Sequence, residues 1–139
     1  MSVMSSEKMT WKAFQQKFHI NLTNQQMDAV QSVNGRILLL AVPGSGKTTV
    51  LVTRLGYMIY CCGIAPENIL TVTYTVAAPR DMAARFRSIF GDEYAGRLEF
   101  RTINGICARI INYYGNGIGK IPFELVTDEK RTSAMLSAI

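Results

Sequence analysis

The sequence predicts an α/β fold in which a parallel sheet carries helices on both faces. Apolar, β-branched runs at 37–42 and 69–73 are each followed by a stretch with helical periodicity, and a third run at 98–101 precedes another. Strands that alternate with helices pair in parallel, because each helix returns the chain across the sheet. Ligands of such folds bind at the carboxyl ends of the strands, so functional residues are expected directly after these runs.

Length and composition limit the class of protein. The 139 residues, 48% of them hydrophobic, suffice for one compact domain with a core, and the net charge of +5 permits a phosphate-bearing partner. Three cysteines match neither a disulfide framework nor a metal-binding spacing, so we expect buried, reduced thiols. The apolar run 37–42 is far shorter than the roughly 18 residues of a membrane span, which indicates a soluble, cytoplasmic chain without a membrane partner.

Two short helices are predicted before the first strand. Trp11, Phe14 and Phe18 fall at i, i+3 and i+7, which is one apolar stripe of a helix that docks on the core. Thr23 begins a second helix, and Gly35 ends it.

Turn residues delimit the later elements. A turn at 43–46 separates the first strand from a helix between Thr48 and about Tyr60, and Pro79 begins a helix that ends near Phe90. The first of these helices is expected to turn one apolar stripe inward: Val50, Leu51, Leu55, Met58 and Ile59. After the third strand, one helix face is expected to hold Ile103, Ile106, Ile110 and Tyr113, and a loop to follow at Gly115, Gly117 and Gly119.

The strongest motif follows the first strand. Residues 41–48 read Ala-Val-Pro-Gly-Ser-Gly-Lys-Thr, which is GxxxxGK[ST] with alanine in place of the first glycine. Gly44 and Gly46 can adopt the positive φ that lets successive N–H groups close around phosphate oxygens, and a helix N-terminus adds about half a positive charge. Lys47 is placed to reach β and γ phosphates, and the Thr48 hydroxyl to bind Mg²⁺. The pattern predicts a nucleotide site, against the alternative of a glycine-rich turn with an exposed lysine.

Four segments in order resemble the UvrD, Rep and PcrA group of superfamily 1 DNA helicases. They are similar to the family's Q motif, phosphate loop, motif Ia and motif Ib, and they lie at Leu22–Gln26, Ala41–Thr48, Thr73–Met82 and Arg101–Gly105. The resemblance implies a RecA-like P-loop NTPase fold, ATP and Mg²⁺ as cofactors, and single-stranded DNA and further helicase domains as partners. It implies catalytic roles for Lys47 and Thr48 and nucleotide contacts from Gln26, Pro43, Gly44, Ser45, Gly46, Lys47, Thr48 and Thr49. It implies DNA contacts from Thr73, Tyr74, Thr75, Thr102 and Asn104.

The role of Gln26 has two interpretations. In the family's Q motif this glutamine reads adenine, and its amide can both donate to and accept from the base. The pattern Thr23-x-x-Gln26 is also a capping box, in which Gln26 turns back to the Thr23 amide. The phosphate loop at family spacing favours the first interpretation.

Several positions depart from the family's pattern. Thr49 stands where many members have arginine, and Tyr74 replaces a phenylalanine but keeps a ring that stacks on bases. Val76 and Ala77 replace an Asn-Lys pair, and Asn104 replaces a histidine. We therefore expect weak contacts between this chain and DNA.

The family's DExx motif, which hydrolysis requires, has a single candidate at 123–129. Glu124 and Thr127 interrupt the apolar strand that should precede that motif, so Asp128 and Glu129 are better explained as a helix start. The domain organisation expected is a helical extension at 1–21, a partial RecA-like domain at 22–126 and the start of a helical region at 127–139. Such a chain is expected to bind nucleotide without hydrolysing it or unwinding DNA.

Two other functional classes fit a phosphate loop. A stand-alone P-loop enzyme such as a small kinase would need a substrate pocket and an arginine-rich lid, and residues 91–139 contain no such segment. The second class is a P-loop module that binds a ligand or a partner protein but has no helicase activity. Its sequence would resemble that of the helicase segment, and mainly the genomic context distinguishes the two.

Overall fold

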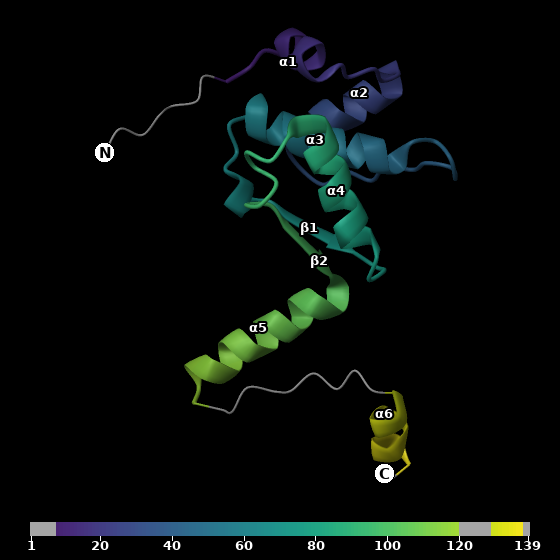
Figure 1. Cartoon of the computed structure of the whole chain (residues 1–139), viewed down its shortest axis with the longest axis vertical. Coiled ribbons are helices and arrows are strands. Elements are labelled where there is room, and N and C mark those ends of the chain that lie inside the picture. The colour runs from purple at the N-terminus through teal and green to yellow at the C-terminus, as the bar shows by residue number, and fades with distance from the viewer. Residues whose placement is uncertain (1–7, 120–128, 138–139) are drawn as a thin grey trace. The chain divides into compact units, whose positions relative to one another are not determined.

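A computed structural model describes residues 8–119 and 129–137 and divides the chain into two compact units, 1–101 and 102–139, which are described separately (Figure 1). The elements up to residue 102 are α1 (Trp11–Phe18), α2 (Asn24–Gln31), α3 (Lys47–Tyr60), the 3₁₀ turn η1 (Pro66–Asn68), β1 (Leu70–Thr73), α4 (Ala78–Phe90) and β2 (Glu99–Thr102). The second unit contains α5 (Ile103–Gly117) and α6 (Glu129–Leu136). The predicted domain boundaries at 21/22 and 126/127 stay predictions.

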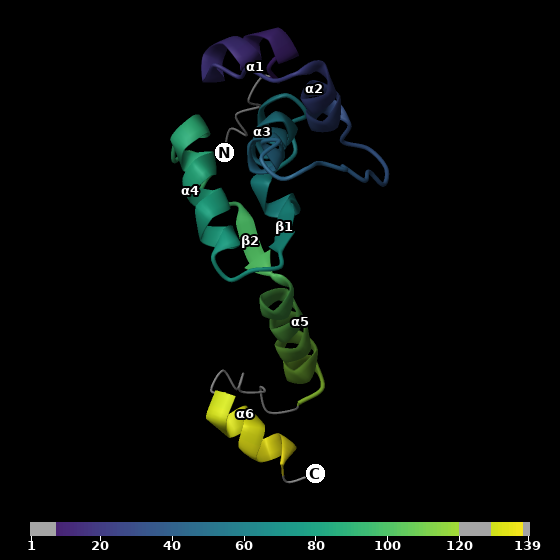
Figure 2. The same ribbon diagram turned by 90° about the vertical axis from the view of Figure 1, so that its right-hand side faces the viewer.

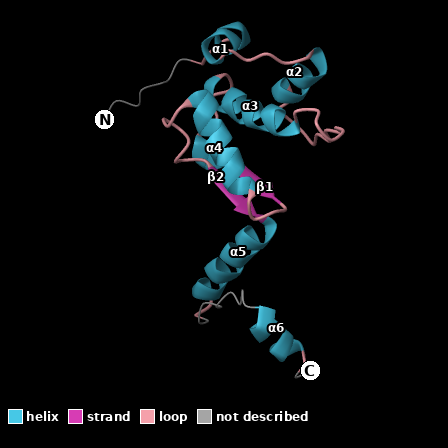
Figure 3. Ribbon diagram, turned by 45° about the vertical axis from the view of Figure 1, so that its right-hand side comes forward, coloured by secondary structure: helices cyan, strands magenta, loops and turns pink. Residues whose placement is uncertain are grey.

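The sheet of the first unit contains β1 and β2, which pair in parallel. The helix α4 lies between them in the sequence and packs beside β1, so β1, α4 and β2 form one βαβ crossover (Figure 2). Figure 3 shows the two strands side by side along α4. The predicted strands at 69–73 and 98–101 are confirmed within one residue at each end, and the α/β class is confirmed with a two-stranded sheet.

The predicted buried strand at 37–42 is wrong. This segment pairs with neither β1 nor β2, the two strands of the sheet among the described residues, and therefore lacks the ladder hydrogen bonds that define a strand. Its side chains still alternate in exposure, since Leu38 and Leu40 are 82% and 83% exposed whereas Ile37 and Leu39 are 44% and 41% exposed. The segment is thus extended, with one face toward the helices and the other toward solvent.

The core of the first unit confirms the predicted docking of α1. Phe14 is fully buried, and its ring lies 5.7 Å from that of Phe90 at the end of α4. Phe18 contacts the same ring at 4.8 Å, and Trp11 packs edge-on against Tyr57 of α3. The buried hydrophobic cluster consists of Phe14, Val52, Leu55, Ile59, Ile69, Met82, Phe86, Phe90, Ala95 and Leu98.

Two details of the predicted α3 helix change in the structure. The helix starts one residue earlier than predicted, at Lys47. Leu51, which was expected to face the core, is 44% exposed, whereas Val52 and Thr53 are buried. The buried face of α3 is turned toward α4, where Gly56 lies against the Phe90 ring. Packing between helices, rather than contact with a strand, sets the inward face.

Two predicted helix ends are wrong. The helix α2 ends at Gln31 with Ser32 as its C-cap, four residues before Gly35. The helix α5 runs through Gly117, so two of the three glycines assigned to a loop are helical, and of the three only Gly119 has a positive φ. Glycine disfavours helix by only about 1 kcal/mol per residue, which a long amphipathic helix tolerates.

All three cysteines are free, but the prediction that they are buried holds only in part. Cys61 and Cys62 are half-buried, and burial raises the pKa of Cys61 to about 11, whereas Cys107 is exposed. Within the described ranges, every helix is too short or too polar to cross a membrane.

Candidate nucleotide-binding site

The loop before α3 has the backbone geometry of an anion site. Gly44 and Gly46 have φ of 79° and 78°, values that L side chains rarely adopt, and the amide of Ser45 donates to the Val42 carbonyl at 3.2 Å. Ser45 also carries a buried hydroxyl without a hydrogen-bond partner. Glycines at these two positions are therefore required by the backbone conformation, as the motif predicted.

The N-terminus of α3 is not capped by a side chain. Gly46 is the N-cap residue and offers no capping oxygen, so the first N–H groups of the helix are not satisfied by a side-chain cap. Partial positive charge at a helix N-terminus and unpaired amides together favour an anion there. The loop therefore fits a phosphate group.

The Lys47 side chain folds back over this loop. Its Nζ donates to the Val42 carbonyl at 3.0 Å and to the Ala41 carbonyl at 3.4 Å, and the residue is exposed. A lysine held by neutral carbonyl groups exchanges them readily for a phosphate, because a charged acceptor forms the stronger bond. Thr48 is exposed at the second position of α3.

Gln26 joins α2 to the same loop. Its Oε1 accepts from the Thr23 amide at 2.9 Å, and its Nε2 donates to the Ser45 carbonyl at 3.1 Å. The Thr23 hydroxyl accepts from the Gln26 amide at 3.3 Å, so the capping box is formed. The second contact, to the phosphate loop, was not foreseen from the sequence.

A cavity of about 400 Å³ lies between α2, the extended segment and the start of α3. This volume is in the range of small-molecule sites, and its lining combines apolar side chains with a few polar groups. The lining residues are Thr23, Gln25, Gln26, Leu39, Leu40, Ala41, Val42, Ser45, Lys47 and Val50. The structure thus brings Gln26, Ser45 and Lys47 to one cavity, which Thr48 and Thr49 do not line. The nucleotide contacts predicted for these residues stay predictions.

Thr48 lines a second, open cavity of about 710 Å³ together with Asp81 and Arg85 of α4. Arg85 Nη2 donates to the Thr49 hydroxyl at 2.8 Å, so a cation lies beside the position where the family often has arginine. Among the described residues no three His, Cys, Asp or Glu side chains gather into a metal site. The Mg²⁺ contact predicted for the Thr48 hydroxyl stays a prediction.

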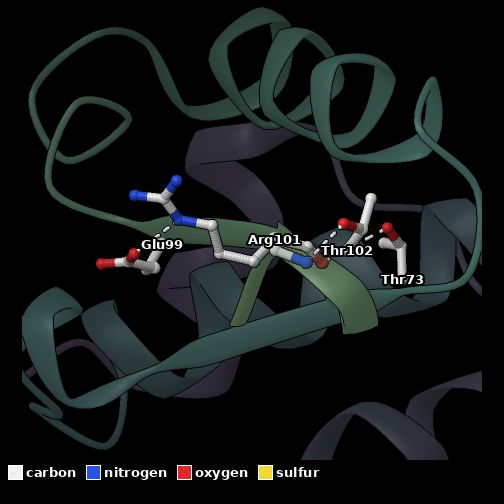
Figure 4. Close-up of polar contacts among 5 residues, drawn as sticks. Thr73, Glu99, Arg101 and Thr102 are labelled. Atoms are coloured by element: carbon white, nitrogen blue, oxygen red, sulfur yellow. Dashed lines mark hydrogen bonds and ion pairs between the residues drawn. The ribbon is translucent and has the colours of Figure 1, made fainter. Parts of the chain in front are cut away.

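The predicted DNA-contacting residues after β1 are accessible. Tyr74 is 89% exposed, so its ring is free to stack. The single O–H of Thr73 has two carbonyl acceptors within reach, that of Thr75 at 3.3 Å and that of Arg101 at 3.4 Å. The Arg101 side chain forms an ion pair with Glu99 at 2.7 Å (Figure 4).

In the second unit, the Thr102 hydroxyl caps α5. It accepts from the Gly105 amide at 3.0 Å, and Asn104 is exposed in the first turn. The DNA contacts predicted for both residues stay predictions. Of the alternative catalytic segment, residues 123–128 lie outside the described residues, and Glu129 begins α6 as the sequence predicted for a helix start.

The chain is similar to a helicase family and to individual helicases. Residues 22–139 match the UvrD/REP helicase N-terminal domain family. The ATP-dependent DNA helicases PcrA of Staphylococcus epidermidis and of Staphylococcus aureus are 35% and 33% identical to the chain over 99 residues, which is 71% of this chain and 13% of each relative. PcrA of Leuconostoc citreum is 33% identical over 98 residues, 70% of this chain and 13% of the relative.

The match begins at the residue where the resemblance to the Q motif begins, and it includes the phosphate loop with its two positive-φ glycines. The matched range covers more than half of the chain and includes all four segments that resemble the helicase motifs. The chain therefore belongs to the UvrD/REP helicase N-terminal domain family.

Proposed function

We propose that this chain is the ATP-binding N-terminal part of an ATP-dependent DNA helicase, which couples ATP hydrolysis to translocation on single-stranded DNA and to duplex unwinding. The observation that carries the proposal is the phosphate loop, where two positive-φ glycines precede a helix without a side-chain cap and Lys47 lies over the loop. A RecA-like P-loop arrangement, with helices on both faces of the parallel sheet, belongs to the same proposal.

Lys47 is proposed to bind the β and γ phosphates, and the amides of 44–46 to surround phosphate oxygens. Pro43, which precedes this loop, and Thr49, in the first turn of α3, are proposed as further nucleotide contacts. Thr48 is proposed to hold Mg²⁺ through its hydroxyl, and the bound ion would neutralise part of the phosphate charge. The chain is expected to bind ATP without hydrolysing it.

Gln26 is proposed to read adenine while it caps α2. A glutamine amide has two N–H donors and two lone pairs on its oxygen, and the contacts to Ser45 and Thr23 use one of each. One donor and one acceptor remain, which is the combination that the N7 and N6 groups of adenine require. The two interpretations of the Thr23-x-x-Gln26 pattern are therefore compatible.

Titration calorimetry of Mg·ATP tests nucleotide binding. A hydrogen bond to a charged group is worth about 1.5–3 kcal/mol, so Lys47→Ala should weaken binding about ten- to a hundredfold. The matched control is Lys12→Ala, which removes an exposed lysine of α1 and should bind like the wild type. Equal affinity of the wild type and Lys47→Ala would refute the proposed phosphate site.

Single-stranded DNA is the proposed second ligand, at Thr73–Thr75 and at Thr102 and Asn104. Stacking on an exposed tyrosine is worth about 1–3 kcal/mol per base, but Arg101 is already paired with Glu99, so few phosphate contacts add to it. We expect weak binding that is detectable only at low salt and is reduced by Tyr74→Ala. Fluorescence anisotropy with a labelled oligonucleotide at two salt concentrations checks this, with Tyr113→Ala as the control for loss of an exposed tyrosine. Tight, salt-insensitive binding would show that another surface is the site.

A further inference from the structure

The helix α2 carries Gln26 but has little support of its own. It is 8 residues long, and isolated helices shorter than about 12–15 residues are marginal in water. Its last turn contains no basic residue, and Ser32 closes it without a left-handed cap. Contacts from other elements must therefore hold α2 and satisfy its terminal carbonyl groups.

Arg54 supplies such a contact from α3. Its Nη1 donates to the Ala29 carbonyl, in the last turn of α2, at 2.5 Å in a partly buried setting. A guanidinium at this place both bonds a terminal carbonyl and meets the negative end of the helix dipole. No ion pair between Arg54 and a carboxylate is found among residues 8–119, so this carbonyl contact is not weakened by a competing acid.

The two polar contacts that join α2 to the nucleotide-site region lie on one face of this helix. Gln26 and Ala29 are three residues apart and therefore neighbours on the helix surface. Gln26 donates to the Ser45 carbonyl of the phosphate loop, and Ala29 accepts from Arg54, about two turns further along α3 than Lys47. Both contacts end on α3 or on the loop that precedes it, so together they fix the distance and the angle between α2 and the phosphate loop.

From this geometry we infer that Arg54 is a positioning residue for base selection: it holds α2 on α3 and thereby sets where the Gln26 amide meets the base. The inference rests on the proposed adenine-reading role of Gln26. Without Arg54, Gln26 forms the one polar contact left between α2 and the phosphate-loop region within residues 8–119. The apolar packing of Val30 does not fix the angle of the helix, so α2 can pivot about the phosphate loop. The phosphates would still bind, because their contacts lie on the loop and α3, but the choice between adenine and guanine would be lost.

The test compares the affinities of ATP, GTP and inorganic triphosphate for the 139-residue chain. A bidentate base contact discriminates by about 1–3 kcal/mol, so wild type should prefer ATP to GTP by about five- to a hundredfold. Arg54→Met keeps the apolar stem and removes the donors, and should bring this preference close to one while the affinity for triphosphate stays within about twofold of the wild type. Arg54→Lys keeps a charged donor and should retain most of the preference.

Arg87→Met is the matched control, because Arg87 is an exposed arginine of α4 that pairs with Asp92 and does not reach α2. A merely structural role of Arg54 predicts a lower melting temperature and equal weakening of all three ligands, and that outcome would overturn the inference. Should Arg54→Met fail to fold by circular dichroism, Arg54→Leu, which also lacks a donor, is the second variant, and an unchanged ATP preference in it contradicts the inference equally.

The controls also separate failure of the inference from failure of the proposed function. A wild type that binds none of the three ligands contradicts the nucleotide site itself, and with it the inference. A wild type that binds ATP and GTP equally contradicts the role of Gln26 and hence that of Arg54. A preference that survives in a folded Arg54→Met variant contradicts Arg54 alone.

Discussion

Gly56 decides how closely α3 and α4 approach. A Cβ built on it would lie 2.3 Å from Cζ of the Phe90 ring, far inside van der Waals contact. Phe90 is itself buried against Phe14 and Phe86, so its ring has little room to move. The glycine is thus required by packing, at a place where helix propensity alone favours alanine.

Gly56→Ala is expected to destabilise the first unit. Overpacking of a buried site costs about 1–3 kcal/mol, which exceeds the gain of about 1 kcal/mol from helix propensity. Urea unfolding followed by circular dichroism measures the change. Gly115→Ala in α5 is the control, because nothing lies within 4 Å of the added Cβ, and it should not destabilise the chain. A neutral or stabilising Gly56→Ala would show that Phe90 moves aside.

Single residues of the site were predictable where one backbone conformation or one short pattern demands them. Positive φ restricts Gly44 and Gly46 to glycine, and the Thr23–Gln26 spacing alone indicates the capping box that is formed. Arg54 and Arg85 were missed, because their partners lie 25 and 36 residues away in the sequence and no local spacing marks them.

At the scale of elements, local signals succeeded and non-local ones failed. The Thr23 cap and Pro79 place the starts of α2 and α4 within one residue, and the β-branched run at 69–73 places β1 equally well. The segment 37–42 has equally strong β-branched and apolar character, but a strand exists only where another strand pairs with it. Sequence composition does not report whether that partner is present, so the strand predicted at 37–42 is absent from the structure.

Backbone amides of 38–42 are expected to exchange hydrogen rapidly. The segment forms no ladder with β1 or β2, so these amides have no sheet partner within the described part of the chain. Hydrogen exchange followed by mass spectrometry should find this peptide largely unprotected, whereas the buried middle of α3 around Val52 exchanges slowly. Protection of 38–42 equal to that of α3 would show that the segment pairs as a strand in solution.

For the molecule as a whole, the first unit combines a well-packed core with a face of unusual apolar exposure. Leu38, Leu40 and Val42 are 72–83% exposed on the outward side of the extended segment, while Phe14, Phe86 and Val52 are fully buried. Clustered exposed apolar side chains mark interaction surfaces or favour association. The net charge of +5 opposes association but does not cover this face.

The chain alone is therefore expected to bind the dye ANS and to self-associate as its concentration rises. The double variant Leu38→Lys/Leu40→Lys should reduce both effects without lowering the melting temperature, because these side chains bury little area. Gln16→Lys/Gln31→Lys adds the same charge at exposed polar positions and should leave ANS binding unchanged. Sedimentation velocity over a range of concentrations measures the association. A wild type that sediments as a monomer throughout and does not bind ANS would show that this face is covered in solution.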